Sequence, residues 1–185
     1  MSRRQVTLSA ATGLSLLAVS ACLHFTPLFI WNASASAPIG LYRLVLSTPI
    51  SIGDLVVVTP PAPLDSFLAD RGYLPRSVPL LKRIVALGGT TVCRIGLTMV
   101  VDGHITGTAL ARDSHDRPLP VWQGCRTLAD DDVFLMNSDV ADSLDGRYFG
   151  PLPVSAIVAR ALPMWTNDGR NGRFEWHLAD PSVVP

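Results

Sequence analysis

The chain has 185 residues, enough for one ordinary domain with room for a short appendage. Hydrophobic residues make up 48% of it and charged residues only 16%, a composition too apolar for a disordered protein and high for a purely soluble one. Lys and Arg number 15, as do Asp and Glu, so no net field attracts the chain to nucleic acid. The sequence also contains no local basic patch, and we expect no nucleic-acid partner.

The N-terminal segment is long, apolar and free of formal charge. After Arg3 and Arg4 the next formally charged residue is Arg43. About 20 apolar residues in a helix cross a hydrocarbon core, and we place a predicted transmembrane helix at residues 6–25. Basic residues before this helix and none soon after it predict a cytoplasmic N-terminus and an exported remainder. Trp31 is the expected anchor at the membrane interface.

Two other interpretations of this segment stay open. Signal peptides also combine a basic start with an apolar run, and residues 33–35 and 35–37 both have the small-x-small pattern of a cleavage site. Residues 19–22, with the sequence VSAC, resemble a bacterial lipobox, in which Cys22 would be lipidated and become the new N-terminus. All three interpretations export the rest of the chain.

Export changes the interpretation of the other two cysteines, because disulfides persist in oxidising compartments. We expect Cys93 and Cys125 to pair, and two unrelated buried thiols are the alternative. Their spacing matches no zinc motif, and the histidines lie apart without a ligand pair. The sequence therefore predicts neither a metal ion nor a cofactor.

The exported part has the pattern of an all-β protein. Most of the Pro and Gly residues lie after residue 36, where they separate short β-branched runs. Asp102 and Gly103 between two such runs are a strong signal for a hairpin. Residues 60–79 form a Pro-rich insertion with a helical turn at about residues 65–70. The expected strands are residues 41–46, 55–59, 82–87, 91–94, 98–101, 133–137 and 156–162.

These segments predict a mainly β protein with one N-terminal transmembrane helix. A cytoplasmic stub and the anchor would occupy residues 1–31, and a β-barrel or sandwich domain residues 32–165. A loose tail rich in Asn, Asp and Gly would follow at residues 166–185.

Ser36 and Lys82 are the candidate catalytic residues. Ser36 lies in a run of small residues a short distance beyond the apolar segment, and Lys82 begins an apolar strand. Taken singly, each has an ordinary interpretation. The serine would belong to a small-residue linker, and the lysine would be a charged residue that protects a strand edge.

Four motifs in order resemble the type I signal peptidase family of serine-lysine proteases. The lysine box lies at residues 82–89, KRIVALGG, and the last box at residues 142–151, DSLDGRYFGP. A Gly-Asp-hydrophobic box lies at residues 53–56, and the serine box begins at residue 34. Residues 36–42, SAPIGLY, are closer to the conjugative-transfer branch, the TraF-type peptidases, whose serine box reads Ser-x-Pro-x-Gly-x-Tyr. The resemblance covers about residues 31–162.

The resemblance implies a signal-peptidase-like β domain and a serine-lysine mechanism. Ser36 would be the nucleophile, and Lys82 the general base that removes its proton. A lysine is a base only when neutral, and the apolar strand after Lys82 offers the burial that lowers a lysine pKa. Ser143 would orient the lysine amine.

Three further roles carry over from the same resemblance. The hydroxyl of Ser34 would join the Ser36 backbone N–H in an oxyanion hole. Asp145 and Arg147 would support the site as an ion pair, with a more direct role for Asp145 in the conjugative branch.

The chain departs from the wider family at several positions. These are Gly88 in place of Pro, Thr90 in place of Asp, Asn137 and Ser138 in place of Gly-Asp, and Gly146 in place of Ser. They affect turns and supporting positions and leave the serine and the lysine unchanged.

The expected function is that of a membrane-anchored endopeptidase at the outer, periplasmic face of the bacterial inner membrane. Its substrates would be exported precursors such as pilin-like subunits of a conjugation system, released by hydrolysis or joined end to end into a ring. A catalytically silent β-domain, tethered or lipidated at Cys22, that builds part of a pilus or secretion complex is the alternative from another class. A housekeeping signal peptidase is disfavoured by the short serine box and by the absence of a second span from the sequence.

Overall fold

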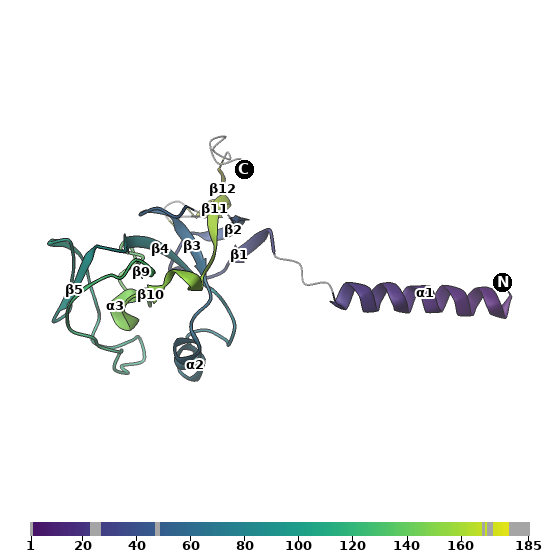
Figure 1. Ribbon diagram of the computed structural model, residues 1–185, viewed down its shortest axis with the longest axis horizontal. Coiled ribbons are helices and arrows are strands. Elements are labelled where there is room, and N and C mark those ends of the chain that lie inside the picture. The colour runs from purple at the N-terminus through teal and green to yellow at the C-terminus, as the bar shows by residue number, and fades with distance from the viewer. Residues whose placement is uncertain (1, 23–26, 47–48, 168, 170–171, 178–185) are drawn as a thin grey trace.

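The computed structural model describes residues 2–22, 27–46, 49–167, 169 and 172–177. Over these residues the protein is mainly β, as the sequence predicts. Figure 1 shows the strands gathered into one body, with the helix α1 (Arg3–Cys22) extending away from it.

The expected transmembrane helix is not supported by this structure. None of the helices in the described ranges combines the length and the hydropathy that a membrane crossing requires. In α1 the apolar residues alternate with small and hydroxyl-bearing ones, and Thr7, Ser9 and Thr12 donate hydrogen bonds to backbone carbonyls one turn earlier. The expected span of residues 6–25 continues past the end of α1 into residues 23–26, which lie outside the described residues.

The larger sheet is antiparallel and carries Lys82 on one of its strands. In the described part of the chain it has eight strands, and β12 pairs with β11 beside the main path. In spatial order these are β1 (Phe29–Asn32), β2 (Ile39–Val45), β11 (Ile157–Asn167), β3 (Leu55–Val58), β4 (Leu80–Leu87), β9 (Asp132–Leu135) and β10 (Leu152–Pro153), with β12 (Glu175–Trp176). The sheet therefore extends past residue 165 into the segment that we expected as a tail.

The smaller sheet is a meander closed by a disulfide. Its order is β7 (His104–Thr108), β6 (Thr98–Val101), β5 (Thr91–Ile95) and β8 (Gly124–Thr127). The predicted hairpin between β6 and β7 is present, with Asp102 at φ 46° and Gly103 at φ 80° as a two-residue turn requires. Cys93 and Cys125 lie directly opposite each other on β5 and β8 and form the expected disulfide.

Three short helical segments complete the body. The helix α2 (Ala62–Asp70) lies in the Pro-rich insertion where one helical turn was expected. The helix α3 (Gly146–Phe149) begins inside the last motif and was not predicted. A 3-10 turn, η1 (Val154–Ala156), leads into β11.

The core lies between these elements and joins the two sheets. Valine and leucine side chains from β3, β4 and β9 pack with Leu68 of α2. A second cluster combines Ala86 and Phe134 of the larger sheet with Val92 and Met99 of the smaller one. Burial of these apolar groups contributes roughly 25 cal/mol per Å² and fixes the strands that carry the site.

A buried arginine also connects the two sheets. Arg94 of β5 is fully buried, and its guanidinium donates to the carbonyl oxygens of Gly96, Pro120 and Arg147. Because Arg147 belongs to α3, the smaller sheet contacts the segment that carries the last motif.

Candidate active site

The loop that carries Ser36 is held by its own neighbours in the sequence. It connects β1 to β2, and Asn32 at the end of β1 donates from Nδ2 to the carbonyl oxygens of Ser34, Ala37 and Pro38. The same side chain accepts the Ser34 N–H on Oδ1. One amide therefore satisfies several backbone groups of the turn and shapes it from inside.

The glycine and the tyrosine of the serine box have distinct structural roles. Gly40 adopts φ 148°, and a Cβ there would collide with the backbone of Trp165 on β11. Tyr42 is buried, and its hydroxyl donates to the carbonyl of Pro38 at 2.6 Å. Burial raises the pKa of this hydroxyl to about 12, so it remains a donor and holds the loop closed.

Lys82 is buried inside the larger sheet. It is on β4, where it pairs with Val56 of β3, and its exposed fraction is 3%. Its Nζ donates to Ser143 Oγ at 2.9 Å and to Ser36 Oγ at 3.3 Å. The interpretation of a charged residue guarding a strand edge is therefore wrong, because β3 and β9 flank β4 on both sides.

The same burial changes the acidity of the lysine. The pKa of Lys82 is lowered from 10.5 to about 8, and burial is the main cause. The carboxylate of Asp145 raises this pKa, and the guanidinium of Arg147 lowers it further. At pH 8 about half of such amines are neutral and able to accept a proton.

The hydroxyl of Ser36 lies between two partners. Its separation from the Lys82 amine, 3.3 Å, is slightly longer than the ~2.6–3.2 Å of a tight catalytic hydrogen bond. On the other side, Ser34 Oγ lies 2.8 Å from Ser36 Oγ and accepts the Ser36 backbone N–H at 3.3 Å. The structure thus brings Ser34, Ser36, Lys82 and Ser143 together.

Asp145 and Arg147 form a fully buried ion pair under these residues. Their closest atoms are 2.9 Å apart, and Asp145 caps the start of α3 by accepting the Arg147 N–H. The guanidinium also donates to the carbonyl oxygens of Val140 and Ser143, which orders the chain leading to the lysine's partner. Burial is the largest effect on the pKa of Arg147 and lowers it, but the hydrogen bonding and charge of Asp145, with the nearby Tyr148 and Asp142, together raise this pKa above its ordinary value.

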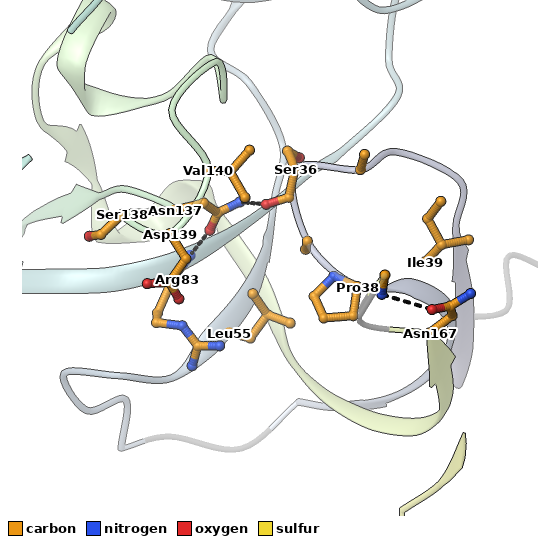
Figure 2. Close-up of a pocket in the computed structure, with 13 residues that line it drawn as sticks. Ser36, Pro38, Ile39, Leu55, Arg83, Asn137, Ser138, Asp139, Val140 and Asn167 are labelled. Carbon is orange, nitrogen blue, oxygen red and sulfur yellow. Dashed lines mark hydrogen bonds between the residues drawn. The ribbon is translucent and has the colours of Figure 1, made fainter. Parts of the chain in front are cut away.

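A cleft of about 590 Å³ opens beside Ser36. Figure 2 shows side chains that line it, among them Ser36, Arg83 and Asn137. Near the serine the wall is made of small groups, Ala35 and Ala37, and Arg83 and Asp139 bring one charge of each sign to the rim.

Asn137 is a functional candidate that our sequence analysis treated only as a departure from the family pattern. It is buried, and its Nδ2 donates to the carbonyl oxygens of Ser36 and Leu81. Its Oδ1 accepts the Arg83 N–H at 3.0 Å. The available signal was a polar residue directly after the apolar run of β9.

Two of the glycine departures have a steric reason. A Cβ on Gly88 would collide with the backbone of Asp130, and one on Gly146 would collide with the Leu135 carbonyl and the Phe134 ring. The serine of the wider family therefore does not fit at position 146 here.

Acidic residues elsewhere do not converge. Within the described residues no group of three or more His, Cys, Asp or Glu side chains is placed to hold a metal ion. Asp132 instead accepts the Ala129 N–H in the turn before β9.

A comparison with protein families identifies the family to which the chain belongs. Residues 2–165 match the family model described as signal peptidase, peptidase S26. The chain belongs to this signal peptidase family.

Several similar curated proteins are named as conjugal or plasmid transfer proteins. A conjugal transfer protein TraF of Agrobacterium fabrum is 36% identical over 149 residues, which cover 74% of this chain and 82% of that protein. A probable conjugal transfer protein TraF of Sinorhizobium fredii is 35% identical over 145 residues, 73% of this chain and 76% of that protein. A plasmid transfer protein TraF of Escherichia coli is 34% identical over 146 residues, 73% of this chain and 81% of that protein.

Among solved structures, a signal peptidase I from Enterococcus faecalis matches with a TM-score of 0.36 and 16% identity. The match covers 63% of this chain and 98% of the solved chain.

Proposed function

We propose that this S26 family member is a membrane-anchored serine endopeptidase that uses Ser36 and Lys82 to cleave signal or propeptide segments from exported precursors. One observation carries the proposal. A lysine with an exposed fraction of 3% and a pKa lowered to about 8 directs its amine at the hydroxyl of a serine beside an open cleft. Burial of a lysine lowers the free energy of unfolding, and such burial is typical of a site whose chemistry needs a neutral amine.

The chemistry follows from this pair. Neutral Lys82 accepts the proton of the Ser36 hydroxyl as its oxygen attacks the scissile carbonyl, and the resulting ammonium then protonates the leaving amine. The product is an ester of Ser36 with the new C-terminus of the precursor. A water molecule, or the amino terminus of the substrate itself, then attacks the ester and returns the serine hydroxyl, giving a free acid or a ring.

The oxyanion of the tetrahedral intermediate would be met by the Ser36 backbone N–H and the Ser34 hydroxyl. The Ser36 N–H donates a hydrogen bond to the Ser34 hydroxyl oxygen at 3.3 Å. Both would turn to the substrate oxygen on binding, and each such donor is worth roughly 2.7–4 kcal/mol in the transition state.

The substrate class that we propose is a pilin-like subunit of a conjugation system. Support comes from the TraF relatives, which are named as conjugal and plasmid transfer proteins. Ala35 and Ala37 line the cleft beside the serine, and in this proposal the residues before the cut are small.

We further propose that the β body works at the periplasmic face of the inner membrane. Leu28, Phe29 and Trp31 on the chain entering from α1 are each about half exposed or more, at 64%, 49% and 50%. Trp31 stacks on Phe174, with ring centroids 5.9 Å apart. Exposed aromatic groups of this kind favour a membrane interface, and the Cys93–Cys125 disulfide suits an oxidising compartment.

The test is processing of a co-expressed pilin-like precursor in membranes, followed by product mass. Ser36→Ala and Lys82→Ala should each abolish processing while the protein stays folded and membrane-bound, and Ser155→Ala, an exposed serine in η1, should leave it intact. The product mass separates a hydrolysed chain from a ring, which is lighter by one water. Unchanged processing in both variants would rule out the proposed peptidase activity and favour the tethered structural component.

A further inference from the structure

The side chain of Asn137 links the two chain segments that carry the nucleophile and the base. Its Nδ2 has two hydrogens, and one is donated to the carbonyl of Ser36 and the other to the carbonyl of Leu81, the residue before Lys82. Figure 2 shows the amide directed at the serine loop from the segment after β9. These contacts span 101 and 56 positions of the chain.

The amide takes the place of a strand. The strand β9 ends at Leu135, but the Met136 N–H still donates to the Arg83 carbonyl. Beyond that point Asn137 Oδ1 accepts the Arg83 N–H while Nδ2 donates to the Leu81 carbonyl, so one side chain continues the ladder along β4. Every polar atom of the amide has a partner, and only this orientation places its oxygen against an N–H and its nitrogen against two carbonyl oxygens.

Asn137 is itself fixed from the other side. Its backbone N–H donates to Asp145 Oδ2 at 3.1 Å, and Asp145 is held by the buried ion pair with Arg147. The ion pair thus holds the Asn137 backbone, and the Asn137 amide holds both β4 and the serine loop.

We infer that Asn137 is a positioning residue that sets the reach between Ser36 Oγ and Lys82 Nζ. This inference rests on the proposed serine-lysine mechanism. The serine loop receives other support from Asn32 within the loop and from Ala37, which packs in one apolar cluster with Leu81 of β4. The Asn137 amide adds directed hydrogen bonds that join the loop to β4 beside the lysine. Only 3.3 Å separates the two catalytic atoms, so a displacement of about 1 Å is enough to lower the rate by about 10²-fold.

The test measures kcat and KM of the full chain in detergent micelles. The probe is a quenched-fluorescence peptide with Ala at the first and third positions before the cut. Asn137→Ala removes the link, and Asn137→Asp keeps the shape but replaces both donors by carboxylate oxygen. The matched control is Gln123→Ala, because this exposed amide also bridges an N–H and a C=O, those of Gly96 in the smaller sheet.

Asn137→Ala should lower kcat by about 10²-fold with KM within about threefold at a temperature where the variant is still folded, whereas Gln123→Ala should keep the wild-type kcat. Asn137→Asp should lower kcat at least as much, and its added negative charge near β4 should move the acidic limb of the pH profile to higher pH. An unchanged kcat, a loss expressed only in KM, or failure of both variants to fold would overturn the inference. Failure of the proposed function is a separate result, because wild type and Ser36→Ala would then cleave the peptide equally.

Discussion

The amine of Lys82 lies closer to Ser143 than to Ser36, at 2.9 Å from one hydroxyl and 3.3 Å from the other. Ser143 is buried, and Arg147 Nη2 donates to its carbonyl at 3.0 Å. The direction of the lysine is therefore determined by a residue whose backbone is bound by the buried ion pair. This arrangement supports a set of measurable consequences.

The rate of peptide cleavage should depend on the protonation of Lys82. Burial lowers its pKa to about 8, so the ammonium dominates at neutral pH and the base is mostly absent. We expect kcat/KM to rise about tenfold per pH unit below pH 8 and to level off above it. A pH series with the quenched peptide from pH 6 to 10 tests this, and a rate already constant at pH 6 would contradict it.

Replacing the lysine should uncover its cost to the fold. The folded pKa of Lys82, about 8, lies below the ordinary 10.5 of the unfolded chain. Between these values the unfolded state binds more protons, so this group penalises stability fully below pH 8 and the penalty is relieved as pH rises toward 10.5. The inactive variant Lys82→Met lacks this penalty at every pH. The difference in unfolding free energy between Lys82→Met and the wild type should therefore shift by about 2–3 kcal/mol in favour of the wild type from pH 7 to pH 10. Urea unfolding at both pH values measures this, and a pH-independent difference would refute it.

Neutralising Asp145 should affect both the base and the fold. Its carboxylate raises the pKa of Lys82, so Asp145→Asn should move the acidic limb of the pH profile to lower pH. The variant also leaves Arg147 buried without its counter-charge, which costs about 3–5 kcal/mol of unfolding free energy. Asp54→Asn is the control, because its ion pair with Arg160 is long, at 3.6 Å, and partly exposed. Equal stability losses in the two variants would count against the role of the buried pair.

The hydroxyl of Ser34 should matter to the rate more than to binding. If it turns from Ser36 to the oxyanion, Ser34→Ala should lower kcat by about 10²–10³-fold with little change in KM. Steady-state kinetics with the quenched peptide give both constants. A rise in KM at constant kcat would instead assign this hydroxyl to substrate binding.

The disulfide should stabilise the protein without taking part in its chemistry. Cys93 and Cys125 are 32 positions apart, and closing a loop of this size is worth about 3–4 kcal/mol. Neither residue lines the cleft, so the double variant Cys93→Ala/Cys125→Ala should unfold at lower urea concentration yet keep wild-type kcat well below its melting temperature. Reducing the wild type with dithiothreitol should reproduce the shift, and loss of kcat in the folded variant would speak against it.

Most of the long strands could be predicted from the sequence because their β-branched runs are contiguous. Each of the seven expected strands overlaps an observed one, from β2 to β11. The strands that were not predicted are short, and β1 lay inside the apolar stretch interpreted as the approach from the membrane anchor. Its four residues form a strand because they pair with β2. Such pairing depends on tertiary structure and leaves no periodic pattern of apolar residues in the sequence.

The site was predictable to the extent that it lies in motifs. The serine box and the lysine box point to Ser36 and Lys82, but the lysine is buried only because the serine loop and the segment with Ser143 meet its amine in the folded chain. Asn137 could not be assigned a role in the same way, because its amide acts on backbone groups far away in the sequence. A side chain that substitutes for a missing strand is visible only once the sheet is assembled.

The contact between Arg94 and the carbonyl of Arg147 bears on how far this protein can be shortened. In the described part of the chain the smaller sheet contributes no residue to the lining of the cleft, so its removal would leave the lining residues in place. Removing β5 would nevertheless take away the cation that neutralises the carbonyl end of α3, and would uncover Ala86 and Phe134 on the other sheet. A shortened chain would have to replace both the hydrogen bond to the Arg147 carbonyl and the cover over this apolar cluster.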